Sequence, residues 1–560
     1  MTILSVSKLG LSGVNTDLEA CDLPPETFTF GQNYRLTNKI IESFNGSTLL
    51  WTATSSINAA HVFFVKDGSN QFYVIAGRNK VLVYNGTVWT DITSTDLAAN
   101  PMTADQEYFW TSCKLGKIPI INNPNHYPEY WDPQQTSQIF QPLKFDAANT
   151  WKQKGYHAKV MRSHKEFLFA LNLSEGANNY PTAYRWSHPA DINGLPPSWD
   201  ETDLAYIASK EQIGGASGEI IDGMSLRDAF CIYSEQAINI LDYTGGEFVF
   251  SRRELTSNFG LLAPNCVVEI NGIHYFLTDG DILSNDGNSV QSILHNTLRK
   301  RIISSLSTDY YKRCFAIKNN YKKEVWFCLV EEGSQLPSLA IVYNWADNSI
   351  SQRELNGTFA HMTVGPTITT NEIYSSTQLT YENVGTLTYD YNASSPFTNT
   401  FIGVKTSTSA LYDIEDNISI TSQTITIPTY ATVTETYDDL GTLTDYDSIY
   451  TNTVFAEDIP YNTVLERDSF SIGNQVDVKT IIRVYPHIKC EGSVYIQIGA
   501  QDYLGAPVRW KPAVRFNPTT QRKVDVRSTG KLHSWRISSI GTDKFILSGF
   551  DIEYVWNGRR

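Results

Sequence analysis

Short apolar and aromatic runs alternate with tight-turn dipeptides along the first two thirds of the chain. In residues 61–92, HVFFVKDGSNQFYVIAGRNKVLVYNGTVWTDI, the runs are separated by turns at Asp67-Gly68 and Asn85-Gly86. Asn-Gly and Asp-Gly between apolar runs are strong hairpin signals, because both central residues of a type I′ turn need a positive φ. This stretch therefore predicts an antiparallel meander.

Similar units follow along the chain at the spacing of propeller blades, about 40–55 residues. They cover residues 118–132, 167–187, 220–246, 267–287 and 313–345. A β-sandwich needs no such repeat, so the pattern favours an irregular β-propeller. The units predict six blades, and a seventh is possible near residues 359–374.

The composition and the apolar/polar pattern of the sequence suggest four regions. We expect an N-terminal leader or arm (1–39), a β-propeller (40–370), an acidic Tyr/Thr-rich insertion or linking region (371–466) and a C-terminal β-sandwich (467–560). The last region alternates cleanly between apolar and polar residues, as in Val494–Ile498, which is typical of sandwich strands. Residues 289–306 carry apolar residues on one helical face, so we expect a helix inserted between blades there.

Composition agrees with a mainly β protein of more than one domain. The chain has 560 residues, too many for one core, and 12% of them are aromatic, which suits strands. No run approaches the roughly 20 apolar residues of a transmembrane helix, and the N-terminus lacks a signal-peptide pattern. We therefore expect no membrane insertion and no conventional export. Seven scattered Cys predict neither a disulfide framework nor a zinc site, and indicate a reducing compartment.

The formal charge of −15 is unevenly distributed. Residues 371–466 contain 14 acidic residues and one basic residue, whereas residues 467–560 contain 15 basic and 8 acidic residues. The reversal predicts a domain boundary near residue 466. It has two interpretations: the solvated surfaces of two unlike modules, or an acidic face that meets a basic face within the chain or between copies.

Motifs for catalysis are missing from the sequence. It contains no G-x-S-x-G elbow, Walker A loop, G-x-G-x-x-G fingerprint or H-E-x-x-H pair. His157 and His164 are the only histidines that could form a local cluster. Asp279-Gly-Asp281 lacks the further acids of a calcium loop. We therefore predict a protein that is not an enzyme, with no catalytic, cofactor-binding or metal-binding residues.

Several stretches resemble the nozzle-type tail proteins of short-tailed, podovirus-like phages. The resemblance lies in the opening and in short motifs spread over most of the chain, whereas residues 359–436 show none. The matching segments are Gly13–Leu18, Leu23–Pro25, Asn33–Arg35, Tyr184–Pro189, Ile240–Gly245, Gly260–Pro264, Asn271–Gly272, Tyr275–Phe276, Asp279–Gly280, Tyr437–Gly441, Ser548–Glu553 and Gly558–Arg560.

The resemblance implies a β-propeller protein of the distal tail tube. Such a protein forms a homo-oligomeric ring of six copies, retains the genome and passes it at ejection. Its implied partners are adaptor and portal-side tail proteins, tail fibres or tip proteins, and genomic DNA in transit, bound non-specifically. The implied location is the virion tail, assembled in the host bacterial cytoplasm.

Two other classes of function remain open from the residues alone. The surplus of Trp and Tyr also suits a receptor- or glycan-binding β-propeller of the virion. A glycosidase comes third, because paired carboxylates can be assembled by the fold without a sequence motif.

One acidic, Tyr-rich segment, residues 435–466, is the candidate for a channel-facing or gating loop. Its charge and aromatic content alone motivate this hypothesis, and a surface insertion between strands fits equally well. The candidate residues are Tyr437, Asp438, Asp439, Asp445, Tyr446 and Asp447.

Overall fold

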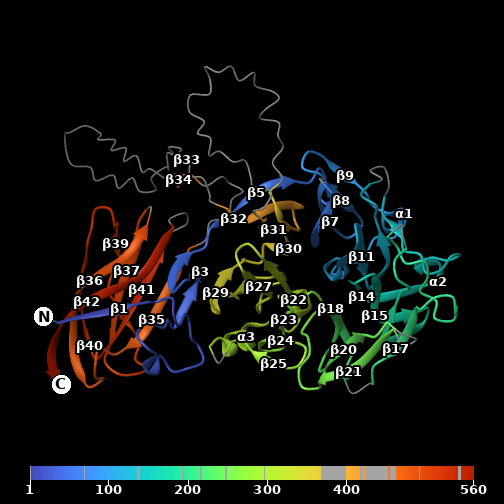
Figure 1. The fold of residues 1–560 in the computed structure, drawn as a ribbon. Coiled ribbons are helices and arrows are strands. Elements are labelled where there is room, and N and C mark those ends of the chain that lie inside the picture. Colours follow the sequence, from blue (N-terminus) through green and yellow to red (C-terminus); the bar gives the residue numbers. More distant parts are fainter. Residues whose placement is uncertain are drawn as a thin grey trace, which may run out of the picture.

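The computed structural model describes most of the chain as two β modules that lie side by side (Figure 1). The described residues are 2–68, 70–134, 139–191, 194–214, 217–245, 249–294, 297–367, 399–416, 421–422, 452–453, 462–490, 492–539 and 544–559. Within them the chain forms an irregular β-propeller of seven four-stranded blades and a β-sandwich.

The first three blades follow one another along the chain. Blade 1 consists of β6 (His61–Asp67), β7 (Asn70–Ala76), β8 (Val81–Tyr84) and β9 (Trp89–Asp91). Blade 2 consists of β10 (Thr111–Leu115), β11 (Ile118–Asn123), β12 (His126–Tyr130) and β13 (Gln141–Pro142). Blade 3 consists of β14 (Tyr156–His164), β15 (Phe167–Glu175), β16 (Asn178–Trp186) and β17 (Ser209–Gln212).

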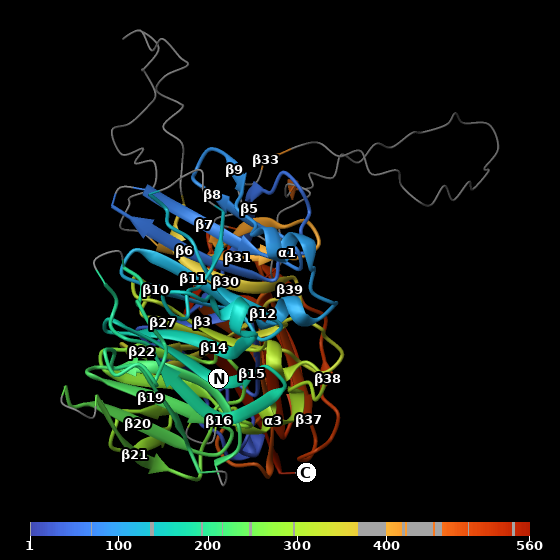
Figure 2. The ribbon, with the colours of Figure 1, turned by 90° about the vertical axis from the view of Figure 1, so that its right-hand side faces the viewer.

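The next three blades repeat the same antiparallel order and are coloured from green to yellow in Figure 2. Blade 4 consists of β18 (Ile220–Leu226), β19 (Ala229–Ser234), β20 (Ile238–Tyr243) and β21 (Phe250–Thr256). Blade 5 consists of β22 (Val267–Ile270), β23 (Ile273–Leu277), β24 (Ile282–Asn285) and β25 (Val290–Ser292). Blade 6 consists of β26 (Phe315–Asn319), β27 (Glu324–Leu329), β28 (Leu339–Asn344) and β29 (Ser349–Glu354).

Blade 7 closes the propeller by combining two distant parts of the chain. Its strands are β30 (Phe359–Pro366), β31 (Asn399–Lys405), β32 (Ala410–Asp416) and, from the N-terminal region, β5 (Gly46–Thr52). Leu411 pairs with Trp51 across β32 and β5, which lie side by side in Figure 1. The Tyr73 hydroxyl of blade 1 donates to the Pro366 carbonyl over 2.6 Å, so blades 7 and 1 are joined.

The sandwich is built from both ends of the chain. One sheet contains β1 (Thr2–Ser7), β3 (Tyr34–Thr37), β4 (Ile40–Ser43), β36 (Asp477–Cys490), β40 (Val524–Gly530) and β42 (Phe545–Arg559). The other contains β2 (Phe30–Gln32), β35 (Val464–Phe470), β37 (Val494–Gln501), β38 (Arg509–Trp510), β39 (Val514–Phe516) and β41 (Leu532–Ser539). Phe28 and Phe550 both pack edge-on against Trp535 between the sheets, with ring centroids 5.1 and 4.7 Å away.

Short elements fill the connections. The helices are α1 (Thr95–Ala99), α2 (Trp151–Lys154) and α3 (Arg299–Ser305), and the 3₁₀ turns are η1 (Ala20–Asp22), η2 (Gln106–Phe109) and η4 (Tyr311–Arg313). A separate two-stranded ladder pairs β33 (Thr421–Ser422) with β34 (Asn452–Thr453).

The two modules share one sheet and one apolar core. Gln352 at the outer edge of blade 6 pairs with Tyr34, so the sheet of that blade continues through β3 and β4 into the sandwich. One cluster of buried apolar residues runs from Ile221 in blade 4 to Trp535 in the sandwich. Because a packed core resists deformation, we infer that the modules move as one body.

A buried charge cluster joins N-terminal strand β3 to blades 6 and 7. Arg35 donates two hydrogen bonds to Glu324, at 2.7 and 3.0 Å, and also pairs with Glu415. Lys322 and Arg353 contact the same Glu415, whose side chain is fully buried. Against the burial that raises it, these three cations lower the pKa of Glu415 to about 2. The Glu415 carboxylate therefore stays ionised inside the junction.

The domain boundaries in the structure differ from those expected. Residues 2–43 are not a free arm: Leu9 is fully buried and strands β1 to β4 belong to the sandwich. The propeller extends to Asp416, because residues 399–416 form a hairpin that completes blade 7. The C-terminal part of the sandwich begins with β35, which starts at Val464, inside the expected linking region.

The helix expected over residues 289–306 is wrong for most of its length. Residues 290–292 pair with β24 as the outer strand of blade 5, and of the described residues in this range (289–294 and 297–306) only those of α3, 299–305, are helical. Leu294 and Leu298 are buried in the shared core, so their apolar character reflects core packing and not a long amphipathic helix.

Candidate functional site: the closed propeller axis and the cavity above it

Seven polar or aromatic residues, one from each blade, meet on the propeller axis. We call this set the axial plug. It consists of His61, Ser112, Arg162, Asp222, Asn265, Phe315 and His361. Six of them lie on the first strand of their blade, counted in sheet order, and Asn265 lies just before β22.

Contacts within the axial plug run round the axis without a break. His61 Nε2 lies 3.0 Å from Ser112 Oγ, and Arg162 donates to the Ser112 carbonyl over 3.0 Å. Arg162 also donates two hydrogen bonds to Asp222, at 2.8 and 2.7 Å. Asn265 donates its backbone N–H to Asp222 over 2.8 Å.

Blades 6 and 7 complete the circuit. The backbone N–H of Ala316, next to Phe315, donates to the Asn265 carbonyl over 2.7 Å. The Phe315 ring centroid lies 4.8 Å from that of His361, which lies 4.2 Å from that of His61. Every blade is thus linked to the next, and side chains close the axis at this level.

Burial and neighbouring charges determine the protonation states of the two histidines in the axial plug. Burial holds the pKa of His61 well below its usual value, and the nearby His361 and Arg162 lower it further. Burial likewise lowers the pKa of His361 to about 4, against the opposing effect of the Val62 carbonyl. Both imidazoles are therefore neutral near pH 7. The positive charge of Arg162 is compensated by Asp222, whose side chain is fully buried.

A cavity of about 670 Å³ opens on one side of the axial plug. Its walls come from blades 2 to 5 and from η4, which precedes blade 6. A crevice of about 20 Å³ shares Phe109, Pro264 and Lys312 with this cavity and is also lined by Asn265 and His361 of the plug. We call the larger space the axial cavity. Its volume is in the range typical of small-ligand sites, about 300–1,000 Å³.

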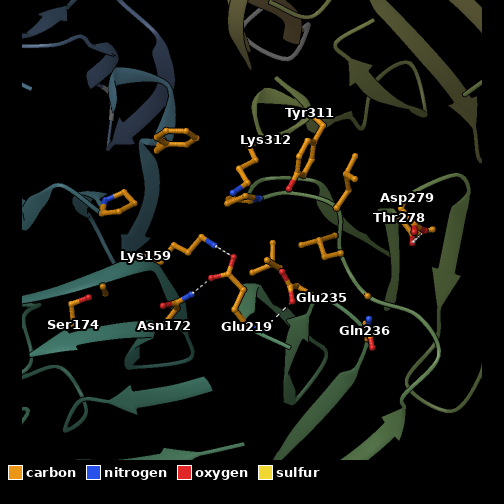
Figure 3. A pocket seen from close by; sticks show the side chains of 18 of the residues that line it. Lys159, Asn172, Ser174, Glu219, Glu235, Gln236, Thr278, Asp279, Tyr311 and Lys312 are labelled. Atoms are coloured by element: carbon orange, nitrogen blue, oxygen red, sulfur yellow. Dashed lines mark hydrogen bonds and ion pairs between the residues drawn. The ribbon is translucent and has the colours of Figure 1, made fainter. Parts of the chain in front are cut away.

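Glu219 is the best-anchored carboxylate of the axial cavity (Figure 3). Lys159 Nζ donates to one of its oxygens over 2.7 Å and Asn172 Nδ2 to the other over 3.1 Å. Burial would raise the pKa of Glu219, but the bonds from Lys159 and Asn172 and the charge of Lys312 lower it below its ordinary value. The carboxylate is therefore ionised and held in one orientation.

The backbone around the axial cavity is shaped to bring these groups together. Asn172 has φ +57° at a register shift in β15, a conformation that Asn tolerates better than most residues and that breaks the strict alternation of the strand. Gly218 has φ +73°, and a Cβ there would lie 2.4 Å from Glu235 Oε2. Glycine thus allows the second carboxylate, Glu235, to approach Glu219, whose N–H donates to it over 3.4 Å.

The opposite wall carries a cation and an aromatic ring. Figure 3 shows Tyr311 and Lys312 facing Glu219 and Glu235 from the other side of the axial cavity. Among the described residues, Lys312 forms no ion pair. His157 also lines the axial cavity; its ring is stacked on Tyr127 with centroids 4.5 Å apart, and burial lowers its pKa.

The residues singled out from the sequence and the residues assembled by the fold are different sets. Tyr437, Asp438, Asp439, Asp445, Tyr446 and Asp447 lie outside the described residues. Of the two histidines considered for a local cluster, His157 lines the axial cavity, whereas His164 binds Ser225 and the Asp228 carbonyl in blade 4.

Sequence reasoning missed the axial plug, although a signal for it exists. Successive members are separated by 43 residues (Asp222 to Asn265) to 60 residues (Arg162 to Asp222), close to the blade repeat. Aligning the units on the first strand of each would have placed these residues in one column.

Across the described residues, no group of three or more His, Cys, Asp or Glu side chains could hold a metal ion. In the same part of the chain, no helix is long and apolar enough to cross a membrane.

Comparison with known proteins gives matches in structure but not in sequence. No family profile and no curated protein matches the chain. The β-propeller domain of Cps50 (Swd1) from Myceliophteria thermophila is 7% identical, with a TM-score of 0.38, over 66% of this chain and 99% of that one. PorZ, a surface component of the type-IX secretion system of Porphyromonas gingivalis, is 8% identical, with a TM-score of 0.31, over 57% of this chain. This chain spans only 35% of the PorZ structure.

Proposed function

We propose that the chain is a structural subunit of a phage tail nozzle, a ring of six copies around the path of the DNA. The observation that carries this proposal is the rigid union of propeller and sandwich through one continuous sheet, together with the buried charge cluster around Glu415. A ring that holds back a packaged genome needs subunits that do not bend. The sequence resemblance to nozzle proteins points the same way.

The axial plug supports one particular route for the DNA. The axis of each propeller is closed by a circuit of contacts that includes the Arg162–Asp222 pair. Breaking a buried ion pair costs about 3–5 kcal/mol, so opening the plug is unfavourable. In the proposed ring the DNA therefore runs between copies, along the ring axis. Because each chain has a net charge of −15, a channel lined by these copies would repel the DNA phosphates and not bind them.

The proposed partners follow from this position in the particle. Portal-side adaptor proteins would bind one end of the ring, and fibres or tip proteins would bind the other. The acidic segment 435–466 remains the candidate for the channel-facing loop. Its Asp438, Asp439, Asp445 and Asp447 would repel the DNA at the gate.

Electron microscopy of the purified full chain tests the ring directly. We expect rings with a central hole in negative stain, and a mass of about 378 kDa for six copies of the 63.0-kDa chain by native mass spectrometry. A monomer at every concentration, together with absence of the chain from purified phage particles by proteomics, would contradict the proposal.

Substitution of the acidic segment tests the gate separately. Replacing Asp438, Asp439, Asp445 and Asp447 by Asn should change DNA retention in assembled particles, measured as packaged DNA per particle. A matched control replaces the same number of exposed aspartates elsewhere, namely Asp203, Asp228, Asp309 and Asp502. Equal DNA retention in the two variants would refute the gating role of the segment, but it would not contradict the ring of six copies.

A further inference from the structure

The axial cavity lies apart from any route for DNA between copies, and its chemistry points to a ligand. Its groups come from separate blades and are held by the fold, as shown by the fixed orientation of Glu219. Towards the axial plug the space narrows to the crevice of about 20 Å³ that Asn265 and His361 line. Nothing in the nozzle proposal requires such a pocket.

Donors and acceptors are nearly balanced in the lining. Glu219, Glu235 and Asp279 accept hydrogen bonds, whereas Lys159, Lys312 and the Asn172 amide donate them. Figure 3 shows Lys159, Asn172, Glu235 and Lys312 around Glu219, whereas Asp279 lies farther away, next to Thr278. A ligand that fits must therefore offer many groups that donate and accept at once.

The balance argues against two other ligand classes. Glu219 and Glu235 disfavour a phosphate or a nucleotide, because the anion would lie close to their carboxylates. An apolar ligand would remove water from charged groups without replacing their hydrogen bonds, which costs free energy for each group.

Hydroxyl groups satisfy these requirements. Each hydroxyl donates one hydrogen bond and accepts others, so neighbouring hydroxyls of a sugar can pair with a carboxylate and a lysine together. The aromatic rings of Phe109, His157 and Tyr311 in the lining provide flat surfaces for the C–H face of a sugar ring. The volume of about 670 Å³ accommodates an oligosaccharide of a few units.

We propose that the axial cavity binds an uncharged oligosaccharide, with Glu219, Glu235, Lys159 and Lys312 as its polar contacts. Glu219 and Glu235 accept from ligand hydroxyls on one side. Lys312, which has no ion-pair partner among the described residues, donates from the other. The site stands independently of the ring, since all of its residues belong to one propeller.

Binding to a printed glycan array tests the proposal. The probe is the purified full chain, applied to immobilised oligosaccharides of bacterial and eukaryotic surfaces, with hits measured again in solution by calorimetry. We expect at least one uncharged oligosaccharide to bind with a dissociation constant of about 1 mM or below. Binding to no uncharged oligosaccharide on the array would overturn the proposal.

Substitutions inside and outside the axial cavity test whether the oligosaccharide binds there. Glu219→Gln should weaken it about tenfold or more, because a hydrogen bond from a ligand to a charged group is lost. Lys312→Ala, at an exposed side chain, should also weaken it and serves as the second variant if Glu219→Gln does not fold. Asp228→Asn lies in the turn between β18 and β19, outside the axial cavity, and is the matched control with unchanged affinity.

Two results would assign the cavity otherwise. Oligosaccharide binding that survives both cavity variants places the sugar site elsewhere on the chain and refutes the proposal. Preferential binding of a hexa-arginine peptide, lost in Glu219→Gln but kept in Asp228→Asn, would show that the carboxylates select a cationic peptide.

Discussion

Glu415 is the residue on which the union of the two modules depends most. Its carboxylate lies among Arg35, Lys322 and Arg353, and its side chain has no exposed surface. Replacing it with Gln keeps the shape but removes a carboxylate from the buried Arg353 and from the partly buried Arg35 and Lys322, while Glu324 stays paired with Arg35. Removing one partner from a buried ion pair costs about 3–5 kcal/mol.

Urea denaturation followed by tryptophan fluorescence measures this cost. Trp326, one of the 12 tryptophans of the chain, donates its indole N–H to Glu324 Oε2 over 3.1 Å, so the emission includes a contribution from the cluster. We expect Glu415→Gln to lower the free energy of unfolding by about 3–5 kcal/mol, a large fraction of the 5–15 kcal/mol typical of folded proteins. Asp502→Asn, which removes an exposed pair with Arg509, is the control and should have no measurable effect.

A double variant distinguishes charge imbalance from simple loss of contacts. Arg35→Met combined with Glu415→Gln removes one buried cation along with the anion and restores the original net charge of the cluster. It should therefore be more stable than Glu415→Gln alone. An unfolding free energy of Glu415→Gln within 1 kcal/mol of the unaltered chain, or a double variant less stable than the single one, would refute the reasoning.

Three further predictions concern the same architecture. Burial lowers the pKa values of His274 and His361 to about 4, so between pH 6.5 and 4 the unfolded chain binds more protons than the folded chain. The urea concentration at the unfolding midpoint should therefore decrease as the pH is lowered from 6.5 to 4. The decrease should be smaller in His361→Phe. Gly260→Ala places a Cβ 2.0 Å from the Glu235 carbonyl and should lower the melting temperature, unlike Gly214→Ala, which meets nothing within 4 Å. Deleting residues 1–52 removes β5 and exposes the edge of β32, so light scattering should detect aggregation of the truncated chain but not of the full one.

The sequence predicted the blades well because their signals are local. Asn271-Gly272, for instance, joins β22 to β23 as its composition indicates, with positive φ at both residues. The mainly β propeller with a C-terminal sandwich is confirmed, with seven blades. Strand pairing between neighbours in sequence needs no knowledge of distant segments.

The features that the sequence did not predict depend on strands that pair across distant parts of the chain. β5 joins β32 across more than 350 residues, and Ile3 pairs with Glu553, so neither the closure of blade 7 nor the composite sandwich has a local signal. The helical period of residues 289–306 was misleading because core positions of a strand and a loop happened to fall at helical spacing. The axial cavity is likewise assembled from strands and loops of different blades, and no single stretch contains enough of it to form a motif.

The most direct test of the account is a cryo-electron microscopy map of the assembled phage tail. The account predicts seven-bladed propellers arranged around the DNA, each with its own axis closed at the level of Arg162 and Asp222. A map in which this chain is absent, or in which DNA passes through the axis of a propeller, would contradict it.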